Sequence, residues 1–142
     1  MRVVLDTNVI ISATLIRGGN EDRIMRLWRH GAFELVLSPL ILEEMARALS
    51  YERLRRLRWM TQAEITTLLQ ALVGESILVP GKATVKVSRD PEDDKFLAAA
   101  LEGQAGYVVT GDKDLLDLRA HENVRIVAPA RFLRVLRLGR LR

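Results

Sequence analysis

The sequence predicts an α/β fold, namely a three-layer α/β/α sandwich around a mostly parallel central sheet of about five strands. Short runs rich in β-branched residues alternate with longer segments that begin and end at helix-capping residues. This alternation is typical of a parallel sheet covered by helices on both faces. At 49% apolar and 28% charged residues, the 142-residue chain has the composition of a globular protein with one core. No internal repeat or flexible linker interrupts it, so we expect residues 1–142 to form a single domain.

Five short strands and four helices account for this alternation. Ser38 and Asp90 are each followed by a proline, and a capping residue before proline is a common helix start. Thr61 with Glu64 three residues later forms a capping box. The expected strands cover residues 2–6, 33–37, 76–79, 106–110 and 124–127, and the expected helices cover residues 20–29, 39–51, 61–74 and 91–102.

Positive charge gathers in two arginine groups. The net charge is +4 and the isoelectric point is near 10, from 22 basic and 18 acidic residues. Residues 90–94 (DPEDD), in contrast, hold four acids. Arginine groups on either side of an acidic segment suit a protein that holds a polyanion against a metal site. A soluble protein with a basic bias and no such site has the same composition. The two groups are Arg53, Arg55, Arg56 and Arg58, and the tail from about residue 131 with Arg131, Arg134, Arg137, Arg140 and Arg142.

The sequence has no cysteine, which fits a reducing cytoplasm and excludes disulfides and thiolate metal sites. The longest uncharged apolar run near its start, residues 7–16, is far shorter than the ~20 residues that span a bilayer. A signal peptide also needs a cationic segment before such a run. We therefore expect a cytoplasmic protein without a membrane anchor.

Acidic residues follow the expected strands. Asp6 ends the first strand, Asp112 follows the fourth, and the DPEDD segment opens the helix that leads into the fourth. In open α/β sheets, ligands bind beyond the carboxyl ends of the strands, where the strand order reverses. Each acid taken alone is equally well explained as a turn residue or a helix N-cap. A functional interpretation therefore depends on several of these acids converging.

Helical periodicity selects among some of these acids and not among others. Glu44 borders the apolar stripe of the helix after the second strand, whereas Glu43 points more toward solvent. A glutamate beside an apolar stripe needs a partner, and a metal ion, water or Arg47 would serve. The residues after DPEDD are apolar at nearly all helical angles, so periodicity does not choose between Asp93 and Asp94.

The donor set favours hard metal ions. With no cysteine and only His30 and His121, carboxylate oxygens would bind Mg²⁺ or Mn²⁺ rather than zinc. No Ser/His or Cys/His pair offers a nucleophile, which leaves metal-activated water and phosphodiester hydrolysis. The hydroxyl groups of Thr7, Ser38 and Thr110 fall next to the acids, where they would orient carboxylates.

Four segments, in this order and spacing, resemble the PIN domain: LDTNV, SPLILEEMARAL, DPEDDKFLAAAL and YVVTGDKDLL. The similarity extends to about residue 127 and is closest to the toxin-like (VapC-like) ribonucleases of type II toxin–antitoxin systems. The resemblance implies a Rossmann-like α/β/α sandwich and an endoribonuclease that depends on Mg²⁺ or Mn²⁺ and acts on RNA. It also implies a homodimer and a cognate antitoxin as partner.

Carried over onto this sequence, the family's catalytic and metal-binding acids correspond to Asp6, Glu44, Asp94 and Asp112. Supporting positions correspond to Asn8, Ser38, Thr110 and Asp114. Asp94 is selected over Asp93 because the family's third acid opens a run of the form D-x-φ-φ-A-A. A further family acid corresponds to either Asp114 or Asp117. The arginine-rich tail belongs to no shared motif, and RNA, a partner or water could contact it.

Other interpretations were weighed on particular residues. Haloacid-dehalogenase-like phosphatases need a D-x-D motif, and Asn8 stands where its second acid would be. Receiver domains need an acidic pair after the first strand and an aspartate after the third, where this chain has Val79 followed by Pro80. An RNA-processing nuclease that is not a toxin, and a catalytically idle module that binds RNA or a partner, both remain alternatives. The motifs do not identify the RNA target.

Overall fold

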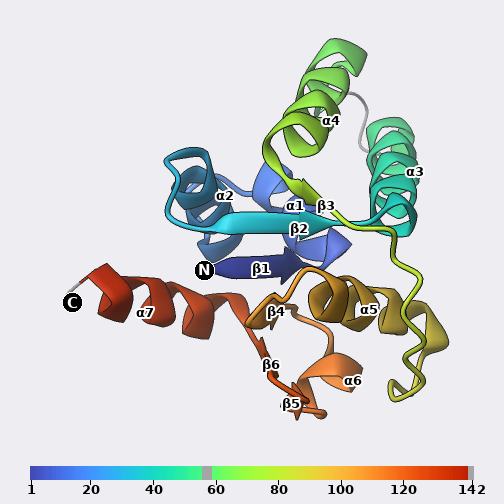
Figure 1. The fold of residues 1–142 in the computed structure, drawn as a ribbon. Coiled ribbons are helices and arrows are strands. Elements are labelled where there is room, and N and C mark those ends of the chain that lie inside the picture. The colour runs from blue at the N-terminus through green and yellow to red at the C-terminus, as the bar shows by residue number, and fades with distance from the viewer. Residues whose placement is uncertain (56–58, 141–142) are drawn as a thin grey trace.

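The computed structural model describes residues 1–55 and 59–140, so Arg56, Arg58 and Arg142 of the arginine groups lie outside the described residues. The described residues form one six-stranded sheet with the order β3-β2-β1-β4-β6-β5, in which only β5 is antiparallel to its neighbour (Figure 1). The strands are β1 (Arg2–Leu5), β2 (Glu34–Leu37), β3 (Ile77–Leu78), β4 (Tyr107–Val109), β5 (Ala120–His121) and β6 (Val124–Val127).

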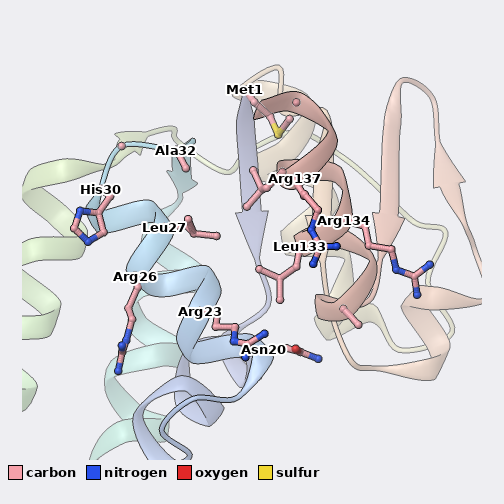
Figure 2. Close-up of a pocket in the computed structure, with 14 residues that line it drawn as sticks. Met1, Asn20, Arg23, Arg26, Leu27, His30, Ala32, Leu133, Arg134 and Arg137 are labelled. Atoms are coloured by element: carbon pink, nitrogen blue, oxygen red, sulfur yellow. The ribbon is translucent and has the colours of Figure 1, made fainter. Parts of the chain in front are cut away.

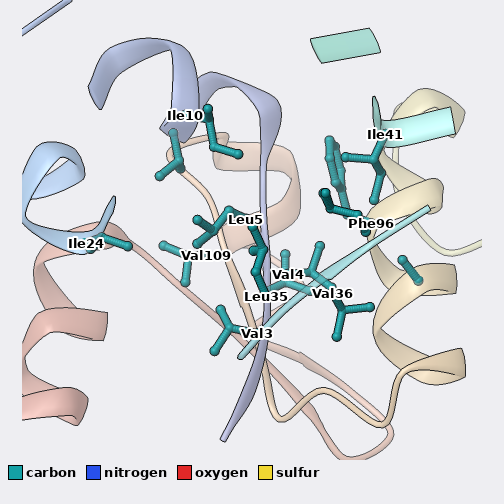
Figure 3. Close-up of a cluster of buried hydrophobic side chains, with 14 of the residues drawn as sticks. Val3, Val4, Leu5, Ile10, Ile24, Leu35, Val36, Ile41, Phe96 and Val109 are labelled. Atoms are coloured by element: carbon teal, nitrogen blue, oxygen red, sulfur yellow. The ribbon is translucent and has the colours of Figure 1, made fainter. Parts of the chain in front are cut away.

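The central strand is buried on both faces, as the α/β prediction requires. Successive side chains of a strand point to opposite faces, and Val3, Val4 and Leu5 of β1 are all fully buried. Figure 3 shows Ile24 on one side of this strand and Phe96 on the other. Helices therefore cover both faces of the sheet, and the three-layer α/β/α class is confirmed.

The helices carry the chain from each strand to the next. All five expected strands and all four expected helices are present, the helix start at Asp90 taking the form of a 3₁₀ turn before α5. The capping box also forms, with Thr61 and Glu64 exchanging hydrogen bonds of 3.0 and 3.1 Å. The helices are α1 (Thr7–Leu15), α2 (Asn20–Arg29), α3 (Pro39–Arg55), α4 (Gln62–Glu75), α5 (Asp94–Glu102), α6 (Lys113–Leu116) and α7 (Pro129–Arg140), with the 3₁₀ turn η1 at Pro91–Asp93.

Four further helices and strands appear beyond the expected ones, namely α1, α6, β5 and α7. The sequence of α1 is uncharged throughout, and Val9, Ile10 and Ile11 are buried in succession. A helix surrounded by protein shows no polar face, and so no period of 3.6 residues marks it. Within the described ranges, no helix is long and apolar enough to cross a bilayer.

The strand order reverses at β1, because β2 lies on one side of it and β4 on the other. The register pairs Leu5 of β1 with Val109 of β4, so Asp6 and Thr110 leave the sheet side by side. The backbone N–H of Asp6 donates to the carbonyl of Val109 at 2.9 Å, which extends the ladder by one residue. This edge is the place where open α/β sheets bind ligands.

Candidate active site

Asp6 lies buried where β1 passes into α1, with 4% of its surface exposed. Its Oδ1 accepts the backbone N–H of Asn8 at 3.1 Å, which makes Asp6 the N-cap of α1. Its Oδ2 accepts the hydroxyl of Thr110 at 2.7 Å. Burial raises the pKa of Asp6, and the charges of Glu44 and Asp112 raise it further. The two hydrogen bonds lower this pKa, but the net effect is an increase.

Asp112 approaches Asp6 from β4. The hydroxyl oxygen of Thr110 accepts the backbone N–H of Asp112 at 3.0 Å, so one buried threonine joins the two acids. The carboxylate of Asp112 in turn accepts the backbone N–H of Asp114 at 3.0 Å and caps α6. Both strand-end acids are therefore N-caps, and both face the same crevice.

Asp93 brings a third carboxyl group to this crevice. Only 9% of its surface is exposed, and its Oδ2 is buried without a hydrogen-bond partner in the described chain. Burial is the main cause that raises the pKa of Asp93 to about 7, followed by a hydrogen bond shared with Asp112 and by the charges of Asp112, Asp90 and Asp6. Asp6 and Asp93 thus resist ionisation in the metal-free protein.

Glu44 lies near this group and is paired with a lysine. Its charge raises the pKa of Asp6, and its Oε2 forms an ion pair with Nζ of Lys95. Lys95 is 10% exposed, donates to the backbone carbonyl of Glu92 at 2.6 Å, and lies 5.0 Å from the ring centre of Phe96. A buried ammonium group therefore neutralises Glu44 at the edge of the acidic crevice.

Asp94, the third acid by family resemblance, makes different contacts. Its Oδ1 accepts the backbone N–H groups of Val87 and Ser88 at 3.3 and 2.9 Å. It thereby fixes the loop before η1. Between these two adjacent acids, it is Asp93 that the structure brings to Asp112.

The supporting residues divide in the same way. Thr110 joins Asp6 to Asp112, whereas Ser38 is buried and its Oγ accepts the backbone N–H of Ile41 at 3.4 Å as the N-cap of α3. Asn8 has an exposed side chain and contributes its backbone N–H to Asp6. Asp114 and Asp117 each form an ion pair with Arg89, at 3.4 and 3.2 Å.

The donor set at this crevice fits a divalent cation, although the side chains are not arranged as a finished metal site. Among residues 1–55 and 59–140, no three carboxylate or histidine groups stand close enough to hold an ion. The orphaned Oδ2 of Asp93 and the raised pKa of Asp6 and Asp93 indicate an acidic cluster that lacks a counter-charge. Hard oxygen donors in such a cluster suit Mg²⁺ or Mn²⁺.

Sequence reasoning left one residue undecided and missed another. The burial of Asp93 follows from the 3₁₀ turn η1, whose length no helical period predicts. Lys95 was read only as part of a family motif. The one signal that could have found it is its position, one residue after Asp94, on a helix whose next five residues are buried.

Three comparisons with known proteins bear on this crevice. The model of the PIN domain family matches residues 2–114. The uncharacterized protein MJ1680 of Methanocaldococcus jannaschii is 34% identical over 119 residues, which are 84% of this chain and 76% of that protein. The fold is similar to VapBC2 from Rickettsia felis, solved bound to a DNA fragment from their promoter, with a TM-score of 0.59, 12% identity, and 90% of this chain and 98% of that chain covered. PIN domains are generally nucleases. The chain therefore belongs to the PIN domain family.

Proposed function

We propose that this chain is an endoribonuclease that depends on Mg²⁺ or Mn²⁺ and hydrolyses RNA phosphodiester bonds. The observation that carries the proposal is the convergence of Asp6, Asp93 and Asp112 at the switch point of the sheet, where burial and the neighbouring charges raise the pKa of Asp6 and of Asp93. A site for substrate alone would not gather like charges, because phosphate is repelled by them. A cation between the carboxylates and the phosphate removes this conflict.

Asp6 and Asp112 are the residues that we assign to hold the cation, with Glu44 on its flank. When bound, the metal supplies a water made acidic enough to attack phosphorus and a charge to stabilise the leaving oxygen. Thr110 keeps Asp6 and Asp112 at a fixed separation by hydrogen-bonding to both. The backbone N–H groups of Asn8 and Asp114 hold one oxygen of each carboxylate, which limits its rotation.

The third acid of the proposed site is Asp93 on geometry and Asp94 on family resemblance. The shared hydrogen bond with Asp112 and the orphaned Oδ2 support Asp93. Asp94 then has a positioning role, because it holds Val87 and Ser88 of the loop. Measuring the metal affinity of Asp93→Asn and of Asp94→Asn separates the two possibilities. Substitution of the residue that binds the metal should lower the affinity at least tenfold.

We further propose that the protein is the toxin of a toxin–antitoxin pair, acts as a homodimer in the cytoplasm and is restrained by an antitoxin protein. The four PIN motifs and the fold shared with VapBC2 support this assignment. The other candidate is an RNA-processing nuclease with the same active site. Induced expression of wild type and of Asp6→Asn in a bacterial host distinguishes them, because only a toxin arrests growth in a manner that the substitution abolishes.

The test of the activity is incubation of the purified protein with a panel of labelled RNAs in Mg²⁺, Mn²⁺ or EDTA, with Asp6→Asn alongside. We expect cutting that needs metal and that the substitution abolishes. The substitution keeps the shape of the side chain and removes its charge, so the fold should persist. Cutting that survives in EDTA or in Asp6→Asn would contradict the proposal. An absence of both cutting and metal binding would favour an idle binding module.

A further inference from the structure

A groove of about 970 Å³ runs between α2 and α7, and none of the acids of the crevice lines it. It extends along β1 from Met1 and Ala32, which precede β1 and β2, to Asn20 and Arg23 at the opposite end (Figure 2). The acids lie at the carboxyl edge.

Arginine dominates the charge of this groove. Its lining residues include Arg23 and Arg26 of α2 and Arg134 and Arg137 of α7, and no acid is among them. In Figure 2 the side chains of Arg23 and Arg137 lie between the two helices, whereas those of Arg26 and Arg134 point away from the gap. Nη2 of Arg26 forms an ion pair with Oδ2 of Asp22 at 3.1 Å. The other three have no carboxylate partner within the described chain.

The sequence of the tail explains this arrangement. Phe132 and Leu136 of α7 are buried against the rest of the protein, and Phe132 packs at 5.3 Å against Phe33. Arg134 and Arg137 stand three residues apart on the exposed side of α7. Figure 2 shows the guanidinium group of Arg137 on the side of α7 that faces α2, and that of Arg134 on the other side.

We propose that this groove binds the phosphate backbone of single-stranded RNA, at a site separate from the acidic crevice. The inference rests on the proposed function in taking RNA as the substrate. The cation proposed for the acidic crevice offsets the carboxylates there and leaves little positive charge for the rest of a polyanion, so further attraction has to come from elsewhere on the molecule. Guanidinium groups match phosphate geometry in bidentate contacts, and Arg23 and Arg137, which are unpaired and lie between the two helices, are free to make them.

The groove floor is compatible with this occupant. Leu27 and Leu133 lie between the arginines of the two helices. Arginine stems lie along apolar surface of this kind and leave their charged ends in water. An acidic protein segment would be attracted by the same charges and would use the same floor. The experiment therefore has to compare the two ligands directly.

The probe is a fluorescein-labelled 20-residue oligouridine, titrated by anisotropy in EDTA against the full chain carrying Asp6→Asn, so that no cutting intervenes. The test protein adds Arg23→Gln and Arg137→Gln. The control adds Arg125→Gln and Arg131→Gln, which remove the same charge from exposed residues outside the groove. Circular dichroism checks that both variants are folded.

Each phosphate contact contributes about 0.7 to the salt slope of single-strand binding. Loss of two contacts should lower the slope by about 1.4. When the salt is raised from about 50 to about 200 mM, the affinity of the parent should therefore fall by a factor about seven times larger than that of the test variant. The control should keep the parent slope within about 0.3. This result supports the groove even where no RNA is cut, and in that case only the nuclease proposal fails.

Two results would overturn the inference. Equal loss in the test and control variants would mean that net charge, and not the groove, governs binding. A 20-residue oligoglutamate that competes with RNA for the parent, loses affinity in the test variant and binds at least as tightly as RNA would identify an acidic protein segment as the occupant.

Discussion

Replacing Asp93 by asparagine should stabilise the metal-free protein at alkaline pH. Burial and the neighbouring Asp112 raise the pKa of Asp93 from the ordinary 3.8 to about 7. A carboxyl group with a raised pKa favours the folded state only while it is protonated. Asparagine keeps the shape and the hydrogen-bond donor of the protonated acid, and it never acquires the charge.

The sign and size of the effect follow from proton linkage. Below pH 4 the folded and unfolded chains both carry the proton, so Asp93 costs nothing. Between pH 4 and pH 7 the unfolded chain loses the proton first, and the stability of the folded wild type falls. Above pH 7 the penalty is complete, with a ceiling of about 4 kcal/mol at about 1.4 kcal/mol per pKa unit. Water at the mouth of the crevice screens part of this, and we expect roughly 2 kcal/mol.

The assay is urea unfolding in EDTA at several pH values between 4 and 8, for wild type, Asp93→Asn and Asp94→Asn. Asp93→Asn should gain roughly 2 kcal/mol at pH 8, and its advantage should nearly vanish at pH 4. Asp94→Asn is the matched control, because Asp94 accepts two backbone N–H groups and should give no gain at any pH. Adding Mg²⁺ at pH 8 should stabilise wild type more than Asp93→Asn. Equal stability of wild type and Asp93→Asn at pH 8 would refute the reasoning.

Three other substitutions test the packing and charges around the crevice. Lys95→Met should cost about 1–2 kcal/mol of stability in EDTA, because Glu44 loses its partner, and should tighten Mg²⁺ binding several-fold in titration calorimetry by removing a competing charge. Unchanged Mg²⁺ affinity would argue against that competition. Thr110→Val should cost about 1–3 kcal/mol in urea unfolding and weaken Mg²⁺ binding, since Asp6 and Asp112 lose their shared hydroxyl. Gly103→Ala should cost about 1–3 kcal/mol, since its Cβ would lie 2.6 Å from Cγ1 of Val36; a melting temperature equal to wild type would contradict this packing.

The sequence predicted those parts of the fold in which a local signal and burial agree. The apolar runs that became strands are bounded by polar or turn residues, and Thr61 with Glu64 marks the start of α4 without help from tertiary contacts. The helix α1 carries no such signal, because its polar residues are spread among apolar ones around the helix and it begins immediately after a strand. The tail was recognised as basic, but its helix could not be assigned a binding face until α2 was known to lie beside it.

The site shows a different limit, because two interpretations that compete in a sequence can both hold in a structure. Asp6 and Asp112 were each explained equally well as N-caps or as members of a metal site. In the structure each caps a helix, and the same geometry turns both carboxyl groups into one crevice. The positive end of α1 beneath Asp6 offsets part of the repulsion that its neighbours impose. Capping is thus one reason why a chain can keep an acidic cluster folded before any cation arrives. Spacing alone could not reveal this, because it depends on β1 and β4 being adjacent.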